Sequence, residues 1–253
     1  MPDQVGHDEE KPDQVGHDMN MGKIYERLAQ DYRIKEGLKA CISCGTCTAI
    51  CPAAEFYRYN PKKIVTIVQS RDDDAIIELL KSDTIWYCGE CLSCVTRCPR
   101  KNAPGLVVMA LRALSIETGY FAESEKGRQM LPLMHAMQHN VLNYGYCVYP
   151  KTFAYDKHPE YGTVGKWTQE HMEDVYERLG AHLGQVGPGA LRKIPQESLD
   201  ELKAIFDITG ATRWMEIVEE KSREKAAEMG LSMEEYEAQA FNQTSSCHLN
   251  PEN

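Results

Sequence analysis

The sequence predicts an all-α protein, and three observations lead to this fold class. Apolar residues recur at helical spacing along much of the 253-residue chain, as at Ile64, Ile67 and Val68. Helix start and stop signals flank such stretches, for example Asn60-Pro61 before this one and Gly119 after a later one. The third observation is a pair of cysteine runs that interrupt the helical pattern in the first half of the chain. A set of short helices joined by cysteine loops is therefore expected.

The two cysteine runs have identical spacing. The first extends from Cys41 to Pro52 and the second from Cys88 to Pro99, and each reads C-x2-C-x2-C-x3-C-P. Every cysteine of the second run lies 47 positions after its counterpart in the first. This spacing is the bacterial-ferredoxin signature of a [4Fe–4S] cluster. The duplication therefore predicts two [4Fe–4S] clusters as cofactors.

The spacing also predicts which cysteines bind which cluster. Three thiolates two residues apart can fold around one corner of a cubane, whereas the fourth lies too far along the chain and precedes a proline. In two-cluster proteins this fourth cysteine binds the other cluster, which brings the two cubanes close together. The predicted metal ligands of cluster 1 are Cys41, Cys44, Cys47 and Cys98. Those of cluster 2 are Cys88, Cys91, Cys94 and Cys51.

Zinc sites and disulfides are the alternatives for these eight cysteines. Zinc knuckles usually carry two C-x2-C pairs, without a third cysteine at the same interval and without the C-P ending. Disulfides are disfavoured in a chain with cytosolic characteristics. Two further cysteines, Cys147 and Cys247, have no neighbouring ligands at metal spacing and are assigned no role.

The cysteine runs fall within a predicted helical module of residues 21–120. Asp72, Asp73 and Asp74 mark one helix start, and another helix is expected from Pro104 to Thr118. Gly45 is expected where the backbone must close over the metal. Trp86 and Tyr87 are expected to shield a cluster from water. The hydroxyls that either donate to the sulfurs or simply fit the tight loops are those of Ser43, Thr46, Ser93 and Thr96.

Residues 121–253 are predicted to form a helical extension that docks on a partner or wraps the module. Residues 130–142 suggest a helix with His135 and His139 on one face, either as a metal or quinone site or as an ordinary surface pair. Residues 143–168 have little periodicity and are expected to form a loop. Three short amphipathic helices follow, the last with a capping box of Ser232 and Glu235. They look too dispersed to build a large core of their own.

Composition limits the classes of partner and compartment. The net charge of −10 argues against nucleic acid, which requires a basic face. Residues 1–20 form a predicted disordered tail with six acids against one lysine, and a direct repeat of Pro-Asp-Gln-Val-Gly-His-Asp. No run approaches the roughly 20 apolar residues of a membrane helix, and no secretory signal is visible. The expected localisation is cytoplasmic, without a membrane span.

The cysteine loops and their flanks resemble the C-type iron–sulfur subunit of heterodisulfide reductase and its relatives. The resemblance rests on the first run through Ala54, on Asn60-Pro61-Lys62-Lys63-Ile64, on Ile85-Trp86-Tyr87-Cys88 and on Cys94 to Arg100, within residues 22–120. It implies an α-helical ferredoxin module with two [4Fe–4S] clusters. It also implies a relay between an A-type flavoprotein subunit and a B-type cysteine-rich subunit.

The length of the chain points within this family to the heterodisulfide-reductase-like complex of sulfur oxidisers. That resemblance implies a lipoate-binding sulfur carrier as a further partner and a role in sulfur metabolism. The chain lacks the cysteine repeats expected of the B-type subunit, so no disulfide chemistry of its own is expected. We expect no catalytic residues, because no nucleophile–base pair or vacant metal position is evident in the sequence.

The expected function is thus that of an electron-transfer subunit in an oxidoreductase complex. One alternative is the iron–sulfur subunit of a flavin dehydrogenase for glycolate or glycerol 3-phosphate, although such chains usually also carry cysteine-rich domains of the B type. Another is a structural assembly protein whose clusters only hold the fold together.

Overall fold

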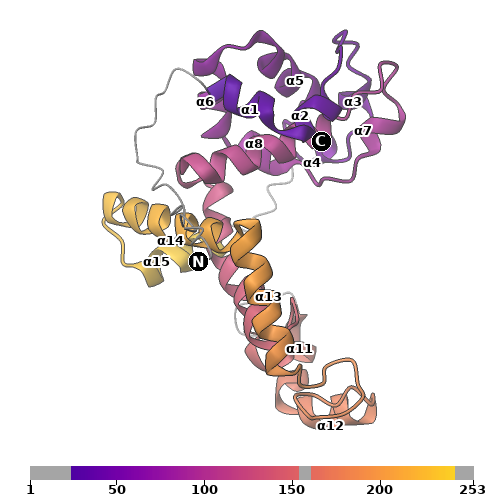
Figure 1. Ribbon diagram of the computed structural model, residues 1–253, viewed down its shortest axis with the longest axis vertical. Helices are drawn as coiled ribbons and strands as arrows, with labels where there is room; N and C mark the ends of the chain where they lie inside the picture. Colours follow the sequence, from indigo (N-terminus) through magenta and orange to yellow (C-terminus); the bar gives the residue numbers. More distant parts are fainter. Residues whose placement is uncertain (1–23, 154–160, 243–253) are drawn as a thin grey trace, which may run out of the picture.

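The computed structural model describes residues 24–153 and 161–242, and all regular structure within them is helical. The predicted all-α fold class is therefore confirmed. Figure 1 shows the cysteine-bearing module at one end of an elongated molecule, with the later helices extending away from it. The predictions for the acidic tail, its repeat and Cys247 lie outside the described residues.

The first part of the chain forms a module of short helices around one long helix, α8. The bounds of α8, Pro104–Thr118, agree with the prediction, and Gly119 ends it in a left-handed conformation with φ 79°. The other elements of this module are α1 (Ile24–Gln30), α2 (Tyr32–Gly37), α3 (Thr46–Ala49), α4 (Ala53–Phe56), α5 (Pro61–Ser70), α6 (Asp73–Leu80), the 3-10 helix η2 (Asp83–Tyr87) and α7 (Ser93–Thr96).

Side-chain caps fix where the two helices between the cysteine runs begin. The Asn60 side chain accepts a hydrogen bond from the backbone N–H of Lys63, with Pro61 in the first turn of α5. The Asp72 carboxylate accepts one from the N–H of Ala75 at the start of α6. Both predicted helix starts are confirmed. Each cap satisfies a backbone donor that would otherwise have no partner inside the helix.

A continuous apolar core holds the module together. Helix α8 contacts α2, α5 and α6, and its Val107 and Leu111 are fully buried. They meet Val68 of α5 and Ile76 of α6 in the same core cluster. Three of the cysteines, Cys41, Cys51 and Cys88, pack against this cluster from outside. The cysteine loops therefore rest on a formed apolar scaffold.

The second part of the chain is mostly helical within the described residues, apart from the long segment over residues 179–195. Helix α11 begins at Gly162 and α10 (His139–Tyr144) ends at Tyr144, so the prediction of a loop over 143–168 is wrong for its last seven and its first two residues. The elements are η3 (Tyr120–Glu123), η4 (Gly127–Gln129), α9 (Met130–Leu133), the π-helical turn η5 (Met134–Gln138), α10 (His139–Tyr144), η6 (Pro150–Thr152), α11 (Gly162–Glu170), α12 (Met172–Arg178), α13 (Gln196–Thr209), α14 (Ala211–Glu228) and α15 (Met233–Asn242).

These later helices build a second apolar core, contrary to the expectation that they were too dispersed. Phe121, Leu131, Val218 and Tyr236 are almost fully buried in one cluster with Ile116, which is the last apolar residue that α8 contributes. The sequence pattern hid this core because its members come from several segments that meet only in the folded chain. The predicted capping box at α15 is confirmed, since Ser232 and Glu235 bond reciprocally.

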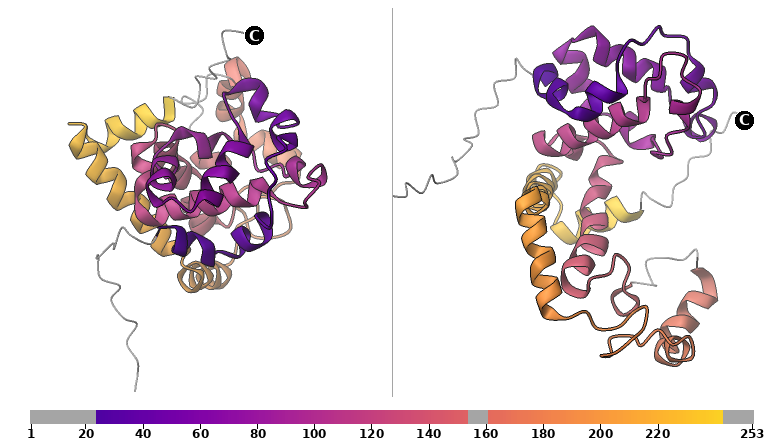
Figure 2. Two further views of the ribbon diagram at one scale, coloured as in Figure 1. Left: turned by 90° about the horizontal axis from the view of Figure 1, so that it is seen from above. Right: turned by 45° about the vertical axis from the view of Figure 1, so that its right-hand side comes forward.

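The two cores are joined through α8. Helix α14 contacts both α8 and η3, so it lies directly under the cysteine-bearing module. Figure 2 shows α13 running alongside the helical segment of α9, η5 and α10, with α11 and α12 at the far end. The cysteine loops lie at the opposite end of the molecule from α11 and α12.

Candidate metal centres

The two cysteine loops have the same backbone conformation. Ser43 and Glu90, which are equivalent in the repeat, have φ of 54° and 52°. The next equivalent pair, Gly45 and Leu92, has φ of 82° and 57°. All four lie in the left-handed region, which turns the chain sharply between successive cysteines. The left-handed conformation explains why a glycine stands at position 45. In the second loop a leucine, Leu92, adopts the same conformation.

A short helix follows each loop and carries its third cysteine. Cys47 lies on α3 and Cys94 on α7, and these two helices contact one another. Burial raises the pKa of the Cys94 thiol, and the neighbouring charges of Cys88 and Cys47 raise it further. The contact between α3 and α7 brings the two runs side by side.

The structure gathers the eight cysteines around two cavities. The first encloses about 240 Å³, and the cysteines that line it are Cys51, Cys88, Cys91 and Cys94. The second is narrower, about 20 Å³, so a cubane would have to widen it; its cysteines are Cys41, Cys44, Cys47 and Cys98. Each cavity thus takes three cysteines from one run and the fourth from the other.

The donors around each cavity fit an iron–sulfur cluster. Both linings contain four thiols and no histidine or carboxylate. Among the residues that the structure describes, no three His, Cys, Asp or Glu side chains converge on a single ion. Four separate thiols around a cavity match a cubane, because each iron atom of such a cluster takes one thiolate.

The hydroxyl groups in the two loops repeat one another. Thr46 Oγ1 lies 3.4 Å from Cys44 Sγ, and Ser93 Oγ lies 3.4 Å from Cys91 Sγ. The side-chain hydrogen bonds lower the pKa of both exposed thiols. Of the other two predicted hydroxyls, that of Thr96 bonds the carbonyl of Ser93 instead, and only the backbone N–H of Ser43 reaches a sulfur, that of Cys41.

Arg112 holds the approach to the second loop. From α8, its Nε donates to the carbonyl of Ile85 at 2.8 Å and its Nη2 to the carbonyl of Cys88 at 2.6 Å. Its Nη1 lies 2.6 Å from a carboxylate oxygen of Glu90, and the guanidinium stacks over Trp86. The Arg112 side chain therefore holds three positions beside the cysteines, namely the carbonyls of Ile85 and Cys88 and the carboxylate of Glu90. Sequence reasoning missed this role, because Arg112 looks like an interruption of an apolar helix.

Asn102 plays the corresponding part at the first loop. It is 2% exposed, and its Oδ1 accepts from the backbone N–H groups of Lys39, at 2.7 Å, and Ala40, at 3.3 Å. Its own backbone N–H donates to Cys98 Sγ at 3.3 Å. The residue thus links the entry to the first run with the last cysteine of the second. No local pattern distinguishes such a residue, since its partners before the first run lie more than 60 positions away.

Aromatic rings cover the first cavity. Tyr59 and Tyr87 both line it, and Tyr87 stacks on Tyr57 with centroids 4.4 Å apart. Burial raises the pKa of Tyr59, which lies beside Cys88, so its hydroxyl stays neutral. Tyr87 thus lies where shielding was predicted. Trp86 instead packs between the two apolar cores.

The predicted His135–His139 pair lies in the second part of the molecule, apart from the cysteines. The rings stack 5.1 Å apart, and His135 is bracketed by two carboxylates. Its Nε2 lies 2.6 Å from Glu219 and its Nδ1 lies 3.1 Å from Glu237. His135 therefore takes part in an ion-pair contact between helices, and His139 stacks against it. Helical spacing would also allow Glu219 to pair with Arg223 four residues later, but the structure places it against His135.

Comparison with known proteins identifies the cysteine-bearing segment. Residues 36–102 match the family model described as a 4Fe-4S dicluster domain. This segment is a 4Fe-4S dicluster domain. Its cofactors are two [4Fe–4S] clusters, and the predicted α-helical dicluster module is confirmed.

Similar proteins are named as C-type subunits of heterodisulfide reductase. The chain is 46% identical over 87 residues to the C-type subunit of ferredoxin:CoB-CoM heterodisulfide reductase from Methanosarcina acetivorans, covering 34% of each chain. It is 37% identical over 89 residues to the second C-type iron–sulfur subunit of CoB–CoM heterodisulfide reductase from Methanocaldococcus jannaschii, covering 35% of this chain and 46% of that one.

A third relative, from Archaeoglobus profundus, is named as a protein like the C-type subunit of heterodisulfide reductase. It is 39% identical over 84 residues, with 32% of this chain and 43% of that protein covered. The chain thus spans less than half the length of each of these relatives. No helix within residues 24–153 or 161–242 combines the length and apolar character needed to cross a bilayer.

Proposed function

We propose that this chain is the iron–sulfur electron-transfer subunit of a heterodisulfide-reductase-like complex. The observation that carries the proposal is the pair of adjoining four-thiol cavities, joined by the contact between α3 and α7. When bound, the two clusters supply one-electron chemistry, and the chain supplies ligands, burial and spacing. The names of its relatives support the assignment to this type of oxidoreductase.

The ligand assignment is part of the proposal. Cluster 1 is held by Cys41, Cys44, Cys47 and Cys98, and cluster 2 by Cys88, Cys91, Cys94 and Cys51. The grouping of the same cysteines around the two cavities supports this crossed arrangement. Crossing makes each cluster a link between the two runs, so both runs must be in place for either cluster to be complete.

A matched pair of substitutions tests the crossing. Cys51→Ala should disturb cluster 2, which the second run holds with its other three cysteines, and Cys98→Ala should disturb cluster 1. The spectrum of the remaining cluster in each variant, measured by electron paramagnetic resonance after reduction, identifies the one lost. If each variant lost the cluster of its own run, the ligands would not cross.

The partners proposed for this relay are an A-type flavoprotein subunit and a B-type cysteine-rich subunit, with a lipoate-binding sulfur carrier in cytoplasmic sulfur oxidation. The names of the relatives support a complex of this type, and the helices after residue 120 offer surface for such partners. Purification of the native complex under anaerobic conditions tests this context. Flavin and the cysteine-rich subunit should co-purify, and a complex free of flavin would contradict it.

A reversible redox cycle separates the relay from an assembly protein whose clusters only hold the fold. Stepwise reduction and reoxidation of the anaerobically prepared chain, followed by its visible absorption, should bleach and restore both clusters. Clusters that cannot be cycled would eliminate the relay and favour the structural role.

A further inference from the structure

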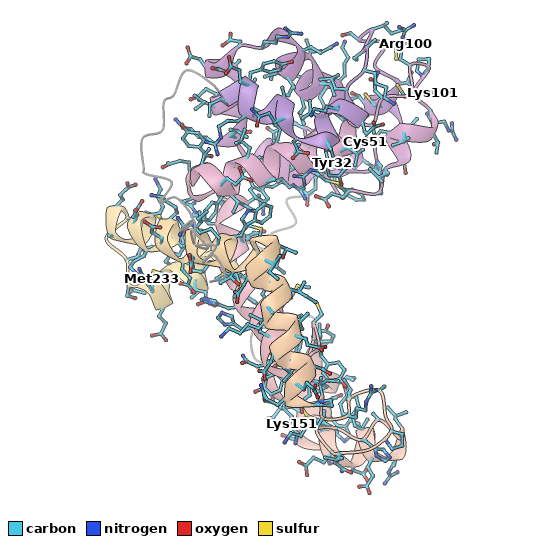
Figure 3. The ribbon with its side chains drawn as sticks, viewed as in Figure 1. Tyr32, Cys51, Arg100, Lys101, Lys151 and Met233 are labelled. Carbon is cyan, nitrogen blue, oxygen red and sulfur yellow. The ribbon has the colours of Figure 1, made fainter. Side chains whose placement is uncertain are left out.

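The surface beside cluster 1 is positively charged, although the protein as a whole has a net charge of −10. Lys62 and Arg100 line the second cavity together with its four cysteines, and no acidic residue does. Arg97 and Lys101 are exposed on either side of Cys98 and Arg100 along the chain. Figure 3 places Arg100 and Lys101 together at the outer edge of the module. We name these four cations, Lys62, Arg97, Arg100 and Lys101, the basic edge.

The cations of the basic edge have no ion-pair partner within the described ranges, 24–153 and 161–242. Elsewhere in the molecule many such groups are paired, as Arg33 is with Asp31 and Arg112 with Glu90. Unpaired cations close together repel one another and contribute nothing to folding. Lys62 and Arg100 line the cavity and would balance the negative charge of a cluster bound by four thiolates. Arg97 and Lys101 do not line it and are exposed, so their presence beside it is better explained by a negative partner than by stability.

The basic edge surrounds an exposed route to cluster 1. Cys44 is solvent-exposed, and the neighbouring Ile42 leaves 61% of its surface open to water. Both line the same cavity as Lys62 and Arg100. An apolar centre with a charged rim is the usual anatomy of a protein interface. A proposed cluster ligand at that centre indicates a partner that exchanges electrons.

The surface beside cluster 2 differs. Leu92 and Phe56 are exposed there, 37% and 47%, and both line the first cavity. Arg112, a cation beside the second loop, is already paired with Glu90. The two ends of the relay therefore present different chemistry, one basic and one apolar.

We infer that the basic edge is a docking surface for an acidic electron-carrier protein, which exchanges electrons with cluster 1. This inference rests on the proposed relay function and adds one of its partners. One electron passes between cluster 1 and the redox centre of the carrier, so that one is oxidised as the other is reduced. Complementary charge steers such encounters and raises the association rate, and the effect weakens as salt screens it.

The test measures electron transfer from the fully reduced, full-length chain by stopped-flow absorption. The probes are a small acidic [2Fe–2S] ferredoxin and, as a counter-probe, basic cytochrome c. The test variant carries Arg97→Glu, Arg100→Glu and Lys101→Glu. A control with the same change in net charge carries Lys203→Glu, Arg213→Glu and Arg223→Glu, at exposed positions on α13 and α14.

We expect the reversal at the basic edge to slow reaction with the acidic probe about tenfold at low salt and to invert its salt dependence. The control should react within about twofold of the wild-type rate, and cytochrome c should not lose rate with the test variant. Iron content should stay unchanged. Because the reversed charges lie beside cluster 1, its potential is measured on each variant and the rates are compared after correction for the change in driving force.

Equal slowing of the test variant and the control would overturn the inference, since net charge alone would then explain the rates. The acidic tail is the competing occupant. If the reversal acted only after the six acids of residues 1–20 were changed to amides, the edge would bind that tail instead. Clusters that cannot be reduced at all would contradict the proposed function, whereas reducible clusters indifferent to the reversal would contradict only this inference.

Discussion

Single residues explain why the two loops are alike in backbone and unlike in chemistry. A leucine in the left-handed region costs about 1–2 kcal/mol, a cost that glycine avoids. Leu92 nevertheless takes the conformation of Gly45, with its side chain lining the first cavity. Its Cδ2 packs on Gly105, where an added Cβ would come within 2.8 Å. The strain is retained where it places an apolar side chain over the first cavity, the proposed site of cluster 2.

Leu92→Gly should therefore relieve the strain of the left-handed backbone at this position but make the cluster easier to lose. We expect iron release to a chelator to be several-fold faster than in the wild type, because water reaches cluster 2 without this cover. Leu92→Ala, which removes the cover but keeps the left-handed strain, should release iron just as fast. If both variants released iron at the wild-type rate, Leu92 would not shield the cluster.

The sequence pointed to the proposed metal ligands but not to the residues that hold them in place. The eight cysteines and Gly45 follow a local motif, so their positions along the chain are informative. Arg112 and Asn102 act on partners 22 to 63 positions away, which only the folded chain brings together. The 47-residue repeat places Leu92 opposite Gly45, but only the backbone angles reveal that the leucine takes the left-handed conformation of the glycine.

At the scale of elements, His135 joins three helical segments. It lies on η5 and contacts Glu219 of α14 and Glu237 of α15. Burial alone lowers the pKa of His135, but the two carboxylates outweigh it and the net shift is upward. The charged imidazolium is therefore favoured in the folded state, and the contact links α14 and α15 to the π-helical turn.

The sign of this shift predicts how stability depends on pH. A raised folded-state pKa means that the contribution of His135 is fully present below its unfolded value of about 6.5 and is lost as pH rises through the folded pKa. His135→Gln should cost roughly 1 kcal/mol at pH 6 and much less at pH 9, measured by denaturant unfolding of the full chain. His139→Gln, which removes only the stacked ring, should show no such pH dependence. A pH-independent loss for His135→Gln would contradict the ion-pair contact.

Helix limits with a cap signal were predictable, as at α5, α6, α8 and α15. The start of α11 was not, because residues 143–168 lack strong periodicity and begin no capping motif. The π-helical turn was also invisible, since His135 and His139 have ordinary helical spacing. Such elements depend on what packs against them, and their partners are distant in the sequence.

At the scale of the whole molecule, two cores share one helix but only one of them adjoins the cysteines. Cys41, Cys51 and Cys88 pack against the first core, and no cysteine of the described residues belongs to the second. The proposed boundaries, with a tail over 1–20, a module over 21–120 and an extension over 121–253, remain a prediction. The last turn of α8 contributes Ile116 to the second core and lies close to the proposed boundary between residues 120 and 121.

Removing iron should therefore affect the two parts unequally, because cluster binding stabilises the loops that supply the ligands. After anaerobic chelation, peptides over 41–60 and 85–103 should lose protection in hydrogen-exchange mass spectrometry, while those over 214–240 keep it. The chain before chelation is the control. Simultaneous loss of protection in all these peptides would show that the two cores fold as one unit.

The most direct test of the central claim is electron paramagnetic resonance of the anaerobically prepared, fully reduced chain, with its iron counted in the same sample. Two [4Fe–4S] clusters held by adjoining cavities predict about eight iron atoms per chain and two reduced cluster signals broadened by their mutual magnetic interaction. A chain that holds zinc, or whose clusters give no signal on reduction, would contradict the account.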